Sequence, residues 1–177
     1  MSTRSGRCIS LPAMTNRSSV EITAARVEAL LRDSPAFTRV DDRFYVVRQG
    51  SAYVYIQVVA WGADRALVRL VAQLVKGVQM TPELALKLLC LNARMRFGAF
   101  GYVRDGACIV FSHTLLGGET LDEAELLTSL RQLALVADEY DDHIVDEAGG
   151  KTMQDLLDDS ASAALAHDLG VGDSWEP

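Results

Sequence analysis

The amino-acid sequence predicts an α+β fold in the order α-βββ-α-ββ-α, with an antiparallel sheet and helices packed on it. Three observations predict this fold class. Apolar residues recur at helical spacing in three segments, strand-like segments fill the regions between them, and short turns join the strands, which favours antiparallel pairing. The 177 residues, 49% of them hydrophobic, are enough to bury the core of one domain.

The first helix is expected at residues 19–32. Ser18 and Glu21 match a capping box, in which two side chains pair with free backbone N–H groups at the start of a helix. Val27 and Leu31 recur on one side of this segment, so it should present an apolar face to a sheet.

Three strands are expected next, at 43–48, 53–59 and 66–74. The second alternates, so that Tyr53 and Tyr55 share one face while Val54 and Ile56 share the other. The third strand carries Arg69, which is tolerated there if its face is open to water or to a partner.

A second helix is expected at 82–94, because Thr81 can cap it and Pro82 suits its first position. Two further strands are expected at 97–103 and 107–115. Asp105-Gly106 between them predicts a tight hairpin turn, since both residues can adopt positive φ.

A long third helix is expected to open at a second capping box, Thr120 to Glu123, and to run to about Glu147, before Gly149-Gly150. A last amphipathic segment at 152–165 is either a docked helix or a mobile tail. The expected organisation is a disordered leader at 1–17, an α+β domain at 18–150 and an acidic C-terminal helix or tail at 151–177.

The net charge of −7 is concentrated near the C-terminus. Residues 141–177 hold ten acidic residues and one lysine, a charge of −9, so the first 140 residues carry +2. Nucleic-acid binding needs clustered Lys and Arg and is not expected. No apolar run reaches the roughly 18 residues of a membrane span, so no membrane partner is expected.

The three cysteines, Cys8, Cys90 and Cys108, are widely spaced and form no Cys-x-x-Cys pair. This pattern argues against a disulfide framework or a zinc site and indicates a reducing, cytoplasmic compartment. Cys90 and Cys108 lie in apolar segments, so both are expected to be small buried hydrophobic residues.

The strongest candidates for catalytic or metal chemistry are Glu139, His143 and Glu147, which fall on one stripe of the third helix. Metal sites usually take ligands from several elements, and no second cluster occurs, so we interpret the stripe as a solvated face. Ser112 and His113 are neighbours in a strand, so they point to opposite faces and cannot form a nucleophile–base pair. No enzyme activity, metal or cofactor is expected.

The main candidate for a binding surface is an aromatic stripe on the first strands, formed by Tyr53 and Tyr55 with Phe44 and Tyr45 nearby. Such a stripe is either core or an exposed groove for a peptide or another subunit. The candidate partner-binding residues are Val27, Leu31, Tyr53, Val54, Tyr55 and Ile56, and some of them must belong to the core.

Several short motifs occur together in the segment TPELALKLLCLNARMRFGAFGYVRDGACIVFSHTLLGGETLDEAELLTSLRQLALVADEYDD and just after it. They are Asn92 near the helix end, Phe97-Gly98-Ala99-Phe100, Asp105-Gly106, His113 to Gly117, Thr120-Leu121, Ala137 to Asp142 and Gly149-Gly150. With them the chain resembles the YbjN domain family, also described as bacterial sensory transduction regulators, over about residues 20–150.

The resemblance implies a fold similar to that of type III secretion chaperones, which bind extended peptides on exposed hydrophobic surface and are usually cytoplasmic homodimers. It implies no catalytic residue. The expected function is a non-enzymatic protein- or peptide-binding module, chaperone-like or a regulatory adaptor of a bacterial cytoplasm. The alternatives are a dimeric signalling or stress regulator without client-chaperone activity, and a small-molecule-binding protein or enzyme.

Overall fold

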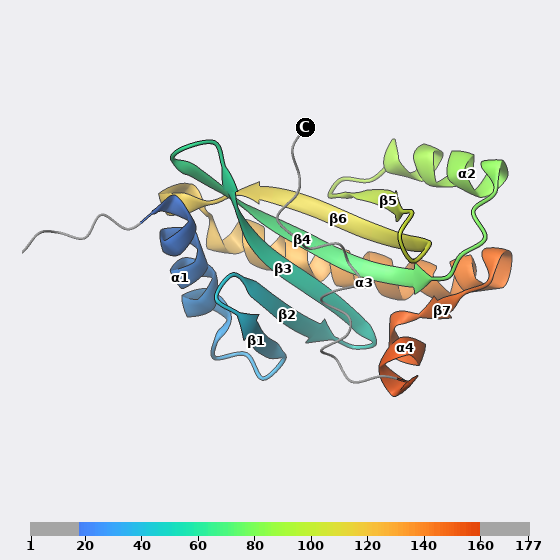
Figure 1. Ribbon diagram of the computed structural model, residues 1–177, viewed down its shortest axis with the longest axis horizontal. Coiled ribbons are helices and arrows are strands. Elements are labelled where there is room, and N and C mark those ends of the chain that lie inside the picture. Colours follow the sequence, from blue (N-terminus) through green and yellow to red (C-terminus); the bar gives the residue numbers. More distant parts are fainter. Residues whose placement is uncertain (1–17, 160–177) are drawn as a thin grey trace, which may run out of the picture.

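The structure is a computed structural model that describes residues 18–159 (Figure 1). The helices in this range are α1 (Ser19–Leu31), α2 (Pro82–Asn92), the 3-10 helix η1 (Gly118–Thr120), α3 (Glu123–Ala148) and α4 (Met153–Asp159). The strands are β1 (Phe37–Asp41), β2 (Phe44–Gln49), β3 (Ala52–Trp61), β4 (Arg65–Lys76), β5 (Ala99–Val103), β6 (Cys108–Leu116) and β7 (Lys151–Thr152). The α+β class and the antiparallel sheet are confirmed.

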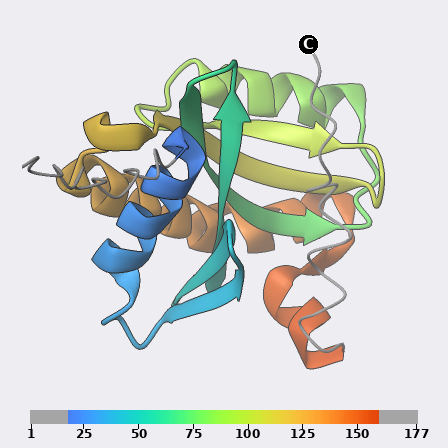
Figure 2. The ribbon, with the colours of Figure 1, turned by 60° about the vertical axis from the view of Figure 1, so that its left-hand side comes forward.

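The described strands form one antiparallel sheet in the order β1-β2-β3-β4-β6-β5, and β7 also pairs with β4. The sheet twists strongly between its β1–β2 end and its β5–β6 end, as Figure 2 shows. Twist of this kind is the normal consequence of L-residue sterics in strands. The order leaves β1 and β5 at the two edges, with the long β3–β4 hairpin in the middle.

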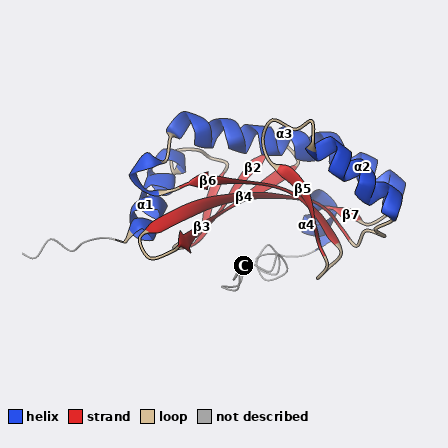
Figure 3. Cartoon of the chain, turned by 90° about the horizontal axis from the view of Figure 1, so that it is seen from above, coloured by secondary structure: helices blue, strands red, loops and turns tan. Residues whose placement is uncertain are grey.

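The helices lie on both sides of this sheet, but unequally. Figure 3 shows α1, α2 and α3 on one side and α4 on the other. We call the side under α1 and α3 the helix-covered face. Its core contains Val27, Ile56, Leu70 and Leu133, all 0% exposed. Burying each such side chain stabilises the fold by about 1.5–3 kcal/mol, so this layer contributes most of the hydrophobic stabilisation.

The starts of α1 and α2 confirm the sequence analysis. Ser18 N donates to Glu21 Oε2 at 2.8 Å, and Glu21 N donates to Ser18 Oγ at 3.3 Å, which completes the capping box. At α2, Leu84 N donates to Thr81 Oγ1 at 3.2 Å. These caps were predictable because each depends on residues at most three positions apart.

The start of α3 differs from the prediction. Asp122, not Thr120, caps α3, and its Oδ1 accepts a hydrogen bond from Glu125 N at 2.8 Å. Thr120 lies in η1, where its hydroxyl donates to Gly117 O at 2.9 Å. The capping box predicted at Thr120 is therefore wrong. Thr120 and Asp122 can both cap a helix, but Thr120 belongs to the short 3-10 helix η1, so Asp122 is left to cap α3.

The turn between β5 and β6 is also longer than predicted. Val103 pairs with Cys108, and positive φ occurs at Gly106 (81°) and Ala107 (50°) rather than at Asp105. Ala107 N donates to Arg104 O at 3.0 Å. The tight turn with positive φ at both Asp105 and Gly106 is thus wrong, since the left-handed residues lie one position later.

Two strands have no counterpart in the sequence prediction. β1 is half-buried to exposed along its length, and β7 is only two residues long. β7 pairs with β4 through Val75 and Thr152, so the sheet includes residues beyond Gly150. The segment predicted at 152–165 forms α4 as far as residue 159, and its remainder lies outside the described residues, as do 1–17.

Cys108 is buried as predicted, but Cys90 is exposed, because α2 turns Leu84 and Leu88 rather than Cys90 toward the sheet. Among the described helices, none is long and apolar enough to cross a membrane.

Candidate functional site

Four of the six predicted binding residues lie in the core of the helix-covered face. Val27 and Ile56 are 0% exposed, Val54 is 1% exposed and Leu31 is 4% exposed. The structure brings these residues of α1 and β3 together, as the sequence analysis expected. They meet, however, in the packing between the helix and the sheet and not in a groove. In this conformation they offer no surface to a partner.

Tyr53 and Tyr55 lie on the opposite side of β3. There Tyr55 is buried in a small second cluster with Phe44 and Met153, and Tyr53 packs against this cluster while half-exposed. The rings of Phe44 and Tyr55 stack with centroids 5.7 Å apart. We call this surface the aromatic face, formed by residues from β2, β3 and β4: Phe44, Val46, Arg48, Tyr53, Tyr55 and Val71.

One end of the aromatic face is covered by α4. Met153 is 3% exposed, and its Sδ lies 3.8 Å from Tyr55 Oη. Asp155 holds the start of this helix, accepting hydrogen bonds from Thr152 N at 3.0 Å and from Thr152 Oγ1 at 2.9 Å. Hydrogen bonding to Thr152 lowers the pKa of Asp155, whereas burial raises the pKa of Tyr55.

The other end of the aromatic face carries a groove of about 500 Å³. Thr38 of β1, Val46 and Arg48 of β2 and Tyr53 of β3 line it. Their strand register places them on one side of the sheet, since Thr38 pairs with Val46 and Arg48 pairs with Tyr53. The volume is within the roughly 300–1,000 Å³ of ligand sites in proteins.

The groove lies beside β1, the edge strand of this end of the sheet. Among the described strands, β1 pairs only with β2, so the backbone groups on its other side have no strand partner. An extended peptide can add to such an edge through main-chain hydrogen bonds. Edge and groove together therefore form a surface suited to an extended chain.

The opposite edge, β5, is capped at one residue, Phe100, by a side chain. Asn92, the last residue of α2, donates from Nδ2 to Phe100 O at 3.1 Å and accepts from Phe100 N at 2.6 Å. The amide thus satisfies both backbone groups of Phe100, as a neighbouring strand would. The two edges of the sheet are consequently not equivalent.

Basic residues surround the aromatic side chains of this side. Arg48 lies over the Tyr53 ring at 5.5 Å, and Arg65 lies over the Trp61 ring at 3.9 Å. Strand alternation also places Arg69 on this side, and β3 contributes no acidic residue to it. The positive charge and the aromatic rings favour a ligand that combines apolar and acidic groups.

Gln73 of β4 adds a polar group on the same side by alternation. It is 2% exposed, and neither its Oε1 nor its Nε2 has a hydrogen-bond partner among the described residues. A buried amide without partners costs about 1–3 kcal/mol.

The side chains considered for catalytic or metal chemistry, Glu147, His113 and Ser112 among them, make separate contacts in the structure. Glu147 forms an ion pair with Lys87, and within residues 18–159 no group of three His, Cys, Asp or Glu side chains is arranged to hold a metal ion. His113 lies edge-on to the Phe97 ring, with centroids 6.0 Å apart. Ser112 pairs with Val71 on the aromatic side, away from His113.

Sequence reasoning missed Thr38 and Arg48, and it named Asn92 as a motif without its role at the β5 edge. Thr38 lies in a β-prone stretch, Phe37 to Val40, which was the available signal for an edge strand. The role of Asn92 had no local signal, since its partner is eight residues away on another element.

The comparisons with known proteins point to one family. The family model TY-Chap1, described as T3SS (YopN, CesT) and YbjN peptide-binding chaperone 1, matches residues 18–156. The match begins at the α1 cap and ends within α4, so it includes every described strand. A comparison with curated proteins found no match.

Proposed function

The chain belongs to the TY-Chap1 family of peptide-binding chaperones, and from this premise we propose that it binds an extended segment of a partner protein on its aromatic face, in the cytoplasm. The observation that carries the proposal is the groove of about 500 Å³ beside the unpaired edge of β1. Binding of this kind needs no chemical step, so the proposal includes no catalytic residue.

The partner segment adds to the sheet as a strand next to β1. Main-chain hydrogen bonds to β1 supply affinity that does not depend on sequence. Alternate side chains of the segment enter the groove, where Val46 and Tyr53 offer apolar contact. The helix-covered face takes no part, because α1 and α3 already fill it.

The chemistry of the groove defines the segment. Arg48 lies over Tyr53 at 5.5 Å, so an acidic residue of the segment can pair with the guanidinium while its apolar neighbours contact the ring. We therefore expect extended segments that combine aliphatic or aromatic residues with Asp or Glu.

The test uses a displayed library of random 15-residue peptides selected on the full chain. Peptides enriched in apolar and acidic residues are expected, and their affinity is then measured by fluorescence anisotropy. Tyr53→Asp should weaken binding at least about tenfold, because it places a charge in the groove.

Tyr102→Asp is the matched control. Tyr102 of β5 is an exposed tyrosine, and it lies outside the aromatic face. Equal losses in both variants, or no loss in Tyr53→Asp, would contradict the proposed site. Hydrogen exchange adds a second measurement, since peptide addition should protect the amides of β1.

A dimeric regulator is the second candidate function, and one observation favours it. Leu86 and Leu89 of α2 are 62% and 65% exposed and stand three residues apart on the same helix. Exposed leucines in such an arrangement are typical of helix-mediated association. We propose that two copies associate through α2, with or without a client peptide.

Light scattering after size exclusion separates the possibilities. A dimer that Leu86→Glu with Leu89→Glu converts to a monomer supports association through α2. A monomer at every accessible concentration argues against both the dimeric regulator and the homodimeric chaperone, but leaves the peptide site itself untouched.

A further inference from the structure

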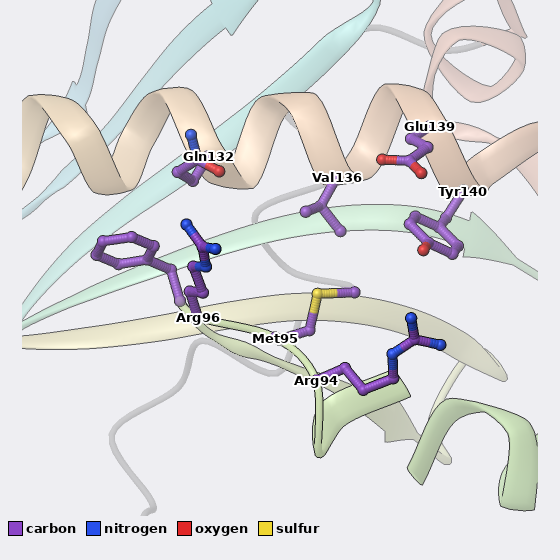
Figure 4. A pocket seen from close by; sticks show the side chains of 8 residues that line it. Arg94, Met95, Arg96, Gln132, Val136, Glu139 and Tyr140 are labelled. Carbon is purple, nitrogen blue, oxygen red and sulfur yellow. The ribbon is translucent and has the colours of Figure 1, made fainter. Parts of the chain in front are cut away.

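A second cleft lies on the helix-covered side of the sheet, across the sheet from the aromatic face. It has a volume of about 250 Å³ and lies between α3 and the turn that joins α2 to β5 (Figure 4). The peptide site proposed above makes no use of it.

Two arginines on the turn border this cleft. Figure 4 shows Arg94 and Arg96 extending from the turn toward α3. Among the described residues, neither guanidinium forms an ion pair or a hydrogen bond. Glu139 of α3 is the one acidic residue of the lining, so the cleft carries a net charge of +1 at neutral pH. The cleft therefore favours an anion.

The remainder of the cleft is mainly apolar. Met95 and Phe97 line it from the turn, and Val136 and Tyr140 line it from α3. All four are half-buried, so the cleft offers apolar contact and is not merely a charged surface. A guanidinium beside apolar side chains is the usual setting for a carboxylate that is attached to an apolar body.

The turn that carries both arginines is held at each end. Before it, Arg94 N donates to Leu91 O at 2.8 Å, and after it the Asn92 amide bonds both backbone groups of Phe100. Gly98 has φ of +70°, and a Cβ there would lie 2.7 Å from Ser112 O, so only glycine fits. A turn fixed in this way places the backbone of Arg94 and Arg96 beside the cleft before any ligand arrives, so only the two side chains have to be ordered on binding.

We propose that this cleft binds a small carboxylate attached to an apolar group, with Arg94 and Arg96 on the carboxylate and Met95, Phe97, Val136 and Tyr140 around the apolar part. The volume lies below the roughly 300–1,000 Å³ of drug-sized sites, so the ligand is small. It is either a free organic acid or the free carboxyl terminus of a peptide that ends in an apolar residue.

The experiment is an NMR titration of the full chain with phenylacetate, observed at the methyl groups of Met95 and Val136. Saturable shifts with a Kd in about the millimolar range are expected. Benzyl alcohol, which has the ring without the charge, should bind at least about tenfold more weakly. Equal affinity for the alcohol, or no saturable shift with phenylacetate, would overturn the proposal.

Variants test the roles of the charges. Arg94→Gln with Arg96→Gln should weaken phenylacetate binding at least about tenfold, while Arg104→Gln, an exposed arginine outside the cleft, should leave it unchanged. Glu139→Gln should strengthen binding about twofold, because it removes a like charge. Unchanged affinity in the double variant would also overturn the proposal.

A tetrapeptide ending in phenylalanine separates the two sources of the carboxylate. The peptide is tested with a free C-terminal carboxylate and as its C-terminal amide. If the free acid binds more tightly than phenylacetate and the amide does not bind, the ligand is a peptide terminus. Weaker binding than phenylacetate identifies a free small acid. Because Tyr53→Asp does not touch this cleft, failure here and failure of the peptide site on the aromatic face are distinguishable.

Discussion

The two faces of the sheet are built from the same strands but are covered to different extents. On the helix-covered face, Ile56 and Leu70 are 0% exposed beneath α1 and α3. On the aromatic face, Tyr53 and Val71 are half-buried, and the described cover is α4 at one end. The first side buries both aliphatic and aromatic residues, Tyr45 and Phe111 among them, whereas Tyr53 and Arg48 on the other side are amphipathic and tolerate both water and a partner. The cover over each face, rather than its share of aromatic residues, thus distinguishes the main core from the proposed binding surface.

The largest expected effect compares matched residues on the two faces. Leu70→Ala should lower the free energy of unfolding by about 2–5 kcal/mol, because it leaves a cavity in the main core. Val71→Ala, the next residue on the other face, should cost about 1 kcal/mol, because this side chain is half-buried. Urea denaturation measures both, and equal costs would remove the distinction between the faces.

The two edges of the sheet also differ, because Asn92 pairs with the backbone of β5 while β1 has no such partner among the described residues. Asn92→Ala should cost about 1–3 kcal/mol, since it leaves the backbone N–H and C=O of Phe100 without their partner. The freed β5 edge should also raise self-association at high concentration. Thermal unfolding and light scattering measure these effects. A variant as stable and as monodisperse as the wild type would show that β5 is not closed by this amide.

The helix on the aromatic face is expected to be the weaker layer. Met153→Ala should cost less than about 2 kcal/mol, because α4 can detach while the sheet stays folded. Hydrogen exchange should show faster exchange in α4 with little change in β3 and β4. A loss of protection throughout the sheet would instead make α4 part of the main core.

The smallest effect concerns pH and the same helix. The pKa of Asp155 is lowered by hydrogen bonds from Thr152, so its ionised form favours the folded α4 start. That stabilisation is present above the unfolded pKa of about 3.9 and is lost as the pH falls through the lower folded value. The NMR chemical shift of the Thr152 amide should change as this hydrogen bond is lost at low pH. Asp155→Asn should remove most of the pH dependence of that chemical shift.

Local patterns predicted a large part of the fold. The Ser18–Glu21 box, the Thr81 cap and the alternation of β3 are each decided within a few residues, and the structure has them where the sequence placed them. The sequence also separated Val54 and Ile56 from Tyr53 and Tyr55, because strand periodicity assigns neighbours to opposite faces. It further supplied the family resemblance.

Local patterns did not predict the site itself. Both sides of β3 carry large apolar residues, so periodicity alone does not show which side the helices cover, and four core residues entered the predicted binding set. β1 depends on pairing with β2, and β7 on pairing with β4.

By itself the sequence determined the class of fold, most helix starts and the division of β3 into two faces, because these depend on residues close together in the chain. The tertiary structure decided which face is core, which edge Asn92 caps and that Arg94 and Arg96 line one cleft with residues of α3. Those outcomes depend on contacts between residues far apart in the chain or on different elements, and such contacts leave no periodic signal.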